Sequence, residues 1–319
     1  MNLPTAATLW ATVVLFVALY GIHLGLSGTR FALSLAIAAI LFAFELFLAA
    51  PPVLDSLRRH FGEALGVLAP LVPLFALLIY AIAVAGGWRN ALIGAAYVVL
   101  PSLLVATGAG KPPGTIGDYA AVAIVWLPVE FKLTYALFPY PSQLTHTLTI
   151  LLALATGIAA FVLLRRLDGI GYAVALSKND AWIILIHFAL FAAIAVAIGT
   201  RIGFLSYDPS LVRLHPIPVV LSIVGILLFT AWPEEFLFRG ILQNLFSRSF
   251  KNPWLGLALA SLLFGLSHIF HAPYPNWKYV LLATIAGLFY GHVWMRTRSL
   301  LPGTFLHALV DISWHILFR

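Results

Sequence analysis

Residues 219–239 read VVLSIVGILLFTAWPEEFLFR. An apolar run of the kind that crosses a bilayer as an α-helix leads directly into two adjacent glutamates, Glu234 and Glu235, and then reaches Arg239. Charged side chains at such depth in hydrocarbon are costly and rare, and they usually serve a function. This stretch therefore predicts a membrane helix with chemistry built into it.

The rest of the sequence repeats the apolar pattern of that stretch. Of the 319 residues, 62% are hydrophobic and only 9% are charged. Such a composition predicts an all-α, polytopic transmembrane helical bundle with about 8–11 membrane helices and no sizeable soluble domain. Continuous apolar runs place the spans at about 8–26, 31–50, 65–85, 90–107, 119–138, 143–164, 181–200, 217–246, 254–270, 279–295 and 300–317.

Composition also limits the partners of the chain. There is no cysteine, which excludes thiolate chemistry, cysteine metal sites and disulfides. The net charge of +7 comes from Lys and Arg scattered between the spans, so we expect the lipid bilayer as a partner and no nucleic acid. The loop at 177–180 separates residues 1–180, transmembrane helices of unassigned role, from residues 181–319, the predicted catalytic domain.

The basic residues favour one set of loops. Lys and Arg are roughly twice as frequent in the loops after even-numbered spans as in the others, and the positive-inside rule places such loops in the cytoplasm. The residues concerned are Arg58, Arg59, Lys111, Arg165, Arg166, Lys178, Arg248, Lys251, Arg296 and Arg298. We therefore expect a multi-pass protein of the cell (plasma) membrane whose N-terminus and active-site opening are cytoplasmic.

The charged residues of the opening stretch divide into two kinds. Glu235 and Arg239 stand four residues apart, so they share a helical face and can form an ion pair that neutralises buried charge. Glu234 points about 100° away from that face. A carboxyl group in that position suits a general base or acid, and we predict a functional role for it.

Two later helices bring further polar groups. His268 ends an apolar run, and His307 and Asp311 have the i, i+4 spacing used by two metal ligands or by a carboxylate that orients an imidazole. At 1.5 Å per residue from the basic turns that join these helices, Glu234 and His268 lie roughly 20–25 Å along their helices, and the other two groups roughly 13–20 Å. We therefore expect the four groups to meet in one cavity.

Two backbone features accompany these groups. Pro233 removes an amide donor from its helix, so we expect a kink or a cavity just before the glutamates. Gly287 and Gly291 have the GxxxG spacing of a helix face that packs closely against a neighbour.

Three motifs follow one another on successive apolar helices: Glu-Glu-x-x-x-Arg, Phe-x-x-x-His and His-x-x-x-Asp. They are formed by Glu234 to Arg239, Phe264 to His268 and His307 to Asp311. In this order they resemble the CPBP intramembrane protease family, which includes the CAAX prenyl endopeptidases and the bacteriocin-processing or self-immunity proteins also called Abi. The resemblance covers residues 217–317, about a third of the chain, and residues 1–180 contribute nothing to it.

The resemblance implies an intramembrane endopeptidase that hydrolyses a peptide bond of a membrane-associated protein or peptide, in CAAX-type or leader-peptide processing. The substrate would be lipidated in the CAAX case. Glu234 would activate the attacking water, and His268 would assist it. The remaining motif residues would brace the site and hold the oxyanion: Glu235, Arg239, His307 and Asp311.

Members of the family are described both as metalloproteases and as metal-independent glutamate proteases. His268, His307 and the carboxylates of Glu234 and Asp311 have the donor types of a zinc site. Equally, Glu234 paired with His268 can act as a general base without Zn²⁺. Many members have Asn where this chain has Asp311, and an ionised Asp cannot donate a hydrogen bond to an oxyanion. Asp311 would then be protonated, orient His307 or bind metal.

Two other functions fit the same polar residues. A non-enzymatic scaffold or immunity protein would keep the fold without the chemistry. A membrane transporter would use buried carboxylates and histidines as a proton or ion site. The complete set of motifs favours the enzyme over the scaffold, and no matching polar set recurs in a repeated half, as a transporter would predict.

Overall fold

The computed structural model describes residues 1–85, 87–208 and 216–318. Within these ranges the chain is helical and contains no β-strand, and nine of the described helices are long and apolar enough to cross a membrane. The expected all-α polytopic bundle is therefore confirmed, and the protein is an integral multi-pass membrane protein.

Two of the expected spans are not among these nine. The helix expected at 119–138 is α7 (Ile116–Glu130), whose 15 residues are too few to cross a bilayer. The helix expected at 279–295 is α14 (Trp277–Thr297), which is long enough but more polar than the others.

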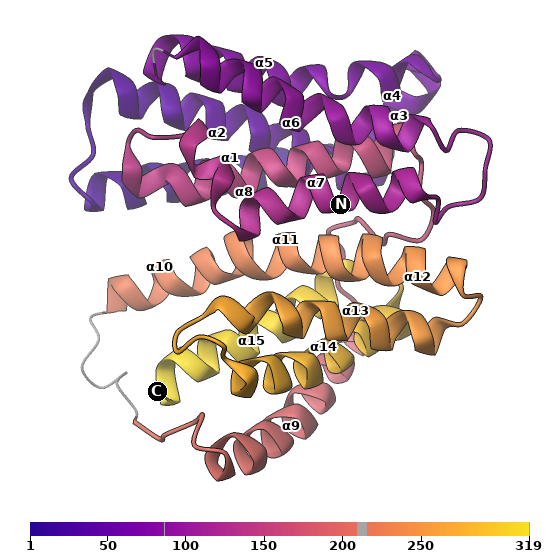
Figure 1. Ribbon diagram of the computed structural model, residues 1–319. Coiled ribbons are helices and arrows are strands. Elements are labelled where there is room, and N and C mark those ends of the chain that lie inside the picture. Colours follow the sequence, from indigo (N-terminus) through magenta and orange to yellow (C-terminus); the bar gives the residue numbers. More distant parts are fainter. Residues whose placement is uncertain (86, 209–215, 319) are drawn as a thin grey trace. The chain divides into compact units, whose positions relative to one another are not determined.

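The chain divides into two compact units, Met1–Asp168 and Gly169–Arg319, which Figure 1 colours indigo to magenta and pink to yellow. Residues 169–177 belong to the second unit by their hydrogen bonds. The N–H of Leu300 donates to the carbonyl of Gly171 at 3.0 Å, and the indole N–H of Trp294 donates to that of Ile170 at 3.0 Å. The division predicted at 180/181 concerns function and stays a prediction.

The first unit is built on one helix that is buried on almost every side. This is α8 (Thr145–Gly157), which continues through a π-helical segment to Leu164. Of the residues in its apolar 18-residue stretch, 94% are buried. A helix that is apolar all round lies either in a protein core or in a membrane, and here neighbouring helices surround it. The helices packed on it are α2 (Gly28–Leu48), α5 (Leu71–Tyr80), α6 (Trp88–Ala106) and α7; α1 (Leu3–His23), α3 (Pro51–Phe61) and α4 (Ala64–Leu68) complete the unit.

A buried ion pair fixes a loop of this unit. The carboxylate of Asp118, in the first turn of α7, accepts the backbone N–H groups of Gly114 and Thr115 at 2.9 Å each. It also binds the guanidinium of Arg165, with an Nε to Oδ1 distance of 2.7 Å. Arg165 in turn donates to the carbonyl of Lys111 at 3.0 Å. The polar groups of the 111–118 loop are thereby satisfied locally.

The second unit carries all three motifs. Its longest rod is formed by α10 (Pro216–Ile226), α11 (Trp232–Glu235) and α12 (Asn244–Ser249), joined by π-helical segments at Leu227–Ala231 and Phe236–Gln243. Three further helices lie against this rod: α13 (Pro253–Ser267), α14 and α15 (Leu300–Leu317). The helix α9 (Lys178–Arg201) packs on α14 and α15 on the side away from the rod, as Figure 1 shows.

Pro233 lies inside this rod, where the sequence predicts a kink or a cavity. The ring of a proline in a helix clashes with the carbonyl four residues earlier, here that of Phe229. The segment Leu227–Ala231, which contains this carbonyl, is π-helical and therefore wider than an α-helical turn. The rod thus bulges just before Glu234 and Glu235 and continues beyond them without a break.

Candidate functional site

The centre of the site is the ion pair between Glu235 and Arg239. These side chains lie on one face of the rod, as their spacing predicts, with Nε of Arg239 3.2 Å from Oε2 of Glu235. Both are buried, with 1% and 0% of the side chain exposed. The guanidinium also donates to the carbonyl of Gly287 at 3.3 Å and lies 4.4 Å from the ring centroid of Phe264. Buried charge is thus balanced on several sides, as a low-dielectric environment requires.

His307 of α15 joins this pair. Its Nδ1 lies 2.9 Å from Oε1 of Glu235, and because a carboxylate oxygen only accepts, Nδ1 carries the proton of this hydrogen bond. Its Nε2 lies 3.5 Å from Oδ2 of Asp311 and 3.8 Å from Oε2 of Glu234. The sequence offers Asp311 as the group that orients His307, but in the structure Glu235 makes the contact at Nδ1 and Asp311 lies near the other nitrogen.

Aromatic rings hold the His307 imidazole on two sides. Tyr290 stacks on it, with centroids 4.5 Å apart and planes 18° from parallel. Phe264 meets it edge to face at 5.6 Å. The side chain of His307 is only 3% exposed, so its ring has little freedom to turn. Glu234, by contrast, has 33% of its side chain exposed, although its Oε2, the oxygen 3.8 Å from His307, is buried.

His268 occupies the end of α13. Its Nδ1 lies 2.8 Å from the carbonyl oxygen of Phe264, so Nδ1 carries the proton and Nε2 carries the lone pair. The ring also packs against Phe264 at 4.9 Å and Tyr279 at 4.4 Å. The residue therefore offers a basic nitrogen from a ring that is fixed by its neighbours.

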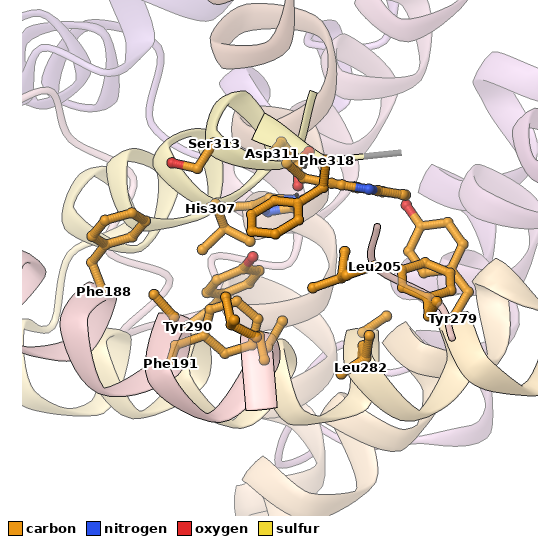
Figure 2. Close-up of a pocket in the computed structure, with 18 of the residues that line it drawn as sticks. Phe188, Phe191, Leu205, Tyr279, Leu282, Tyr290, His307, Asp311, Ser313 and Phe318 are labelled. Carbon is orange, nitrogen blue, oxygen red and sulfur yellow. Dashed lines mark ion pairs between the residues drawn. The ribbon is translucent and has the colours of Figure 1, made fainter. Parts of the chain in front are cut away.

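A cavity of about 110 Å³ connects His268 with His307 and Asp311, all of which line it (Figure 2). Its walls are mostly apolar and come from α9, α13, α14 and α15, with rings such as Phe188 and Phe191 on the α9 side. Glu234 is not among the lining residues. Three of the four polar groups expected in one cavity therefore line it. The fourth, Glu234, does not, but its Oε2 lies 3.8 Å from Nε2 of His307.

The four predicted zinc ligands are Glu234, His268, His307 and Asp311. Within the described residues, no group of three or more His, Cys, Asp or Glu side chains is arranged to hold a metal ion. Glu234 and Asp311 lie near Nε2 of His307, whereas the ring of His268 packs on Phe264, His271 and Tyr279. The predicted zinc set is thus not preformed. Metal dependence stays a prediction.

One polar residue of this region is not indicated by the motifs. Gln243 lies one turn beyond Arg239, is fully buried, and donates from Nε2 to the carbonyl of Gly291 at 3.2 Å. Arg239 and Gln243 thus bind the carbonyls of Gly287 and Gly291 in register. The GxxxG face predicted to pack closely does so here, and an added methyl group at Gly291 would overlap the Gln243 side chain. The i, i+4, i+8 spacing from Glu235 is the signal that could have revealed Gln243.

The cavity lies toward one end of the second unit. The 15 residues of α13 rise about 22 Å, from the basic turn at 248–251 to His268. The described Lys and Arg residues near the first end are Lys178, Arg248, Lys251, Arg296 and Arg298; those near the His268 end are Arg201 and Lys278. The two parts of the predicted orientation, cytoplasmic basic turns and a cytoplasmic opening, therefore conflict.

Comparison with known proteins identifies the segment that carries the site. Residues 216–313 match the family model described as type II CAAX prenyl endopeptidase Rce1-like. That segment is similar to this family. The matched stretch includes every motif residue from Glu234 to Asp311, and the predicted recognition of the CPBP/CAAX family is confirmed. No curated protein and no solved structure matches the chain. The Rce1-like match supports a protease of the CAAX type embedded in the membrane.

Proposed function

We propose that this protein is an intramembrane endopeptidase that hydrolyses a peptide bond of a membrane-associated protein or peptide by activating water at Glu234 and His268. The observation that carries the proposal is the chain of contacts Arg239–Glu235–His307, which ends at an imidazole nitrogen facing Glu234 and the cavity. A buried ion pair of purely structural use would need no third, titratable partner.

Water activation is assigned to the two basic groups that remain accessible. Glu234 is one-third exposed, and a carboxylate beside the scissile carbonyl can take a proton from water as the oxygen attacks. His268 presents the lone pair of Nε2 at the cavity and can accept a hydrogen bond from the same water. Proton transfer of this kind contributes about 10²–10⁴-fold to a rate.

His307 is assigned the role of stabilising the negative charge that develops on the carbonyl oxygen of the substrate. Its Nδ1–H is held by Glu235, so in the imidazolium form its Nε2–H is the donor on the side of Glu234 and Asp311. The carboxylate of Glu235, paired with Arg239, stabilises that imidazolium. Asp311 near Nε2 adds negative charge when ionised and a second donor when protonated.

The substrate is proposed from the shape of the cavity and from the family. An apolar cavity reached from membrane helices suits a peptide anchored in the bilayer, and the Rce1-like match favours a lipidated CAAX-type substrate over a leader peptide. The protein is proposed to lie in the plasma membrane with its basic turns in the cytoplasm. The cavity then lies toward the opposite face, which revises the predicted opening.

Orientation can be read from single cysteines, because the chain has none of its own. Ser249→Cys and Ala272→Cys place a thiol at opposite ends of α13. A membrane-impermeant maleimide should label Ala272→Cys in intact cells and Ser249→Cys only after lysis. The reverse pattern would return the cavity to the cytoplasmic side.

The test of the proposed function is cleavage by the purified protein in lipid. Wild type is compared with Glu234→Gln on prenylated C-terminal peptides and leader-type peptides. Glu45→Gln is the matched control, since Glu45 is a buried glutamate of a membrane helix in the first unit. Cleavage by wild type and Glu45→Gln but not by Glu234→Gln supports the proposal. Equal cleavage by all three removes Glu234 from the mechanism, and no cleavage by any favours a scaffold.

A further inference from the structure

Tyr290 belongs to none of the three motifs, yet it lies at their centre. It stands on α14 between Gly287 and Gly291, and only 1% of it is exposed. Its ring is stacked on His307 at 4.5 Å, and the guanidinium carbon of Arg239 lies 5.3 Å from its centroid. Figure 2 shows Tyr290 beside His307 at the wall of the cavity.

The stack controls which way His307 points. The hydrogen bond from Nδ1 to Glu235 holds one atom of the imidazole, and the ring can still tilt by rotation about its Cβ–Cγ bond. The face of Tyr290, 18° from parallel, removes this rotation, and the edge-on ring of Phe264 closes the other direction. Nε2 is thereby kept facing Glu234 and Asp311. The π-face of a tyrosine also attracts an imidazolium, so the stack favours the charged form that the mechanism uses.

Tyr290 is in turn held in place by the helix that carries it. Arg239 and Gln243 donate to the carbonyls of Gly287 and Gly291, one on each side of Tyr290 along α14. These two bonds set the distance and the rotation of α14 against the rod. A backbone anchored on both sides of the residue leaves its ring little room to move away from His307.

We infer that Tyr290 is a positioning residue for the proposed hydrolysis, acting through its ring on His307 rather than through its hydroxyl group. The inference rests on the proposed function for its catalytic consequence, but the stack itself can be tested without activity. The ring is the part of the side chain that touches His307, so a phenylalanine should replace it and an aliphatic residue should not.

The kinetic experiment compares Tyr290→Phe with Tyr290→Leu. We expect Tyr290→Leu to lower kcat roughly 10–100-fold, the usual effect of a misplaced catalytic group, with KM changed less than about threefold. Its pH–kcat profile should be displaced from that of wild type. Tyr290→Phe should keep kcat within about threefold and superimpose on the wild-type profile. Tyr97→Leu, at a buried tyrosine of the first unit, controls for the loss of a large core ring.

A second measurement keeps the inference separate from the proposed function. ¹⁵N NMR of histidine-labelled protein in lipid reports the ring nitrogens, and the His307 signals are assigned by their loss in His307→Gln. These signals should move in Tyr290→Leu and stay in place in Tyr290→Phe, even if no substrate is ever cleaved. Unchanged signals in both variants, or equal loss of kcat in both, would overturn the role of the ring.

Discussion

Each unit of this protein contains a buried arginine–carboxylate pair, and the two pairs are built differently. In the first unit, Asp118 is bound by Arg165 at 2.7 Å and by two backbone N–H groups at 2.9 Å. Nη2 of Arg165 also donates to the loop carbonyls of Lys111 and Pro112. The pair closes on itself, and every contact serves the same loop.

The pair in the second unit is left open. Glu235 meets Arg239 at 3.2 Å with one oxygen and gives the other to His307. Nη1 of Arg239 has no hydrogen-bond partner among the described residues. An arginine paired with a carboxylate thus holds a loop in one unit and orients a histidine beside a cavity in the other. The second pair differs from the first by a third, titratable partner, His307.

The largest difference is expected when each carboxylate becomes an amide. Glu235→Gln removes the charge that stabilises the imidazolium and offers Nδ1 of His307 a group that can also donate, which permits the wrong tautomer. We expect kcat to fall about 10³-fold or more in Glu235→Gln. Asp118→Asn should leave kcat per folded molecule unchanged. Equal losses of kcat would mean that the two pairs are not different in kind.

The free energy of unfolding should depend on the Asp118–Arg165 pair of the first unit. Arg165→Met leaves Asp118 buried beside backbone donors but without its counter-charge, and breaking such a pair costs about 3–5 kcal/mol. Denaturant unfolding in detergent should show this loss while kcat at low temperature stays at the wild-type value. A wild-type free energy of unfolding would show that the backbone donors alone satisfy Asp118.

Disrupting the close packing of α13 on α14 should have a smaller effect on stability and on kcat. A methyl group at Gly265 would lie 2.7 Å from the carbonyl oxygen of Val280, so Gly265→Ala must push the two helices apart. We expect a loss of about 1–3 kcal/mol in stability and a lower kcat, because His268 follows three residues later. Gly225→Ala is the matched control, since nothing lies within 4 Å of its added methyl group.

Asp311→Asn should have the smallest effect. Because Glu235 already makes the contact at Nδ1 of His307, Asp311 is not needed to orient the ring, and an amide near Nε2 can donate to an oxyanion. We expect kcat within about tenfold of wild type and no response of the wild-type enzyme to chelators. A large loss in Asp311→Asn together with inhibition by chelators would support the zinc set.

Much of this arrangement can be predicted from the sequence, because the spacing of residues along a helix fixes their relative positions in space. The i, i+4 rule predicts that Glu235 and Arg239 pair, and the rise per residue brings groups from three helices to the same region. The partner of His307 could not be predicted in this way. Spacing shows that His307 and Asp311 share a face, but not which ring nitrogen meets which carboxylate.

Other features depend on contacts between helices that no single helix reveals. Gln243 and Tyr290 look like ordinary core residues until α14 is docked on the rod. The cavity wall from α9 has no motif at all, because apolar residues serve equally well toward lipid and toward a substrate. The length of α7 was overestimated because an apolar run continues past Glu130, where the helix ends.

The central claim is that His307, held by Glu235, serves peptide-bond hydrolysis. The most direct measurement is the cleavage rate of His307→Gln in lipid beside His187→Gln, a histidine of α9 whose ring is hydrogen-bonded to His292. His307→Gln should lose cleavage almost completely while His187→Gln retains it, with both proteins folded. Wild-type cleavage by His307→Gln would contradict the proposed role of His307.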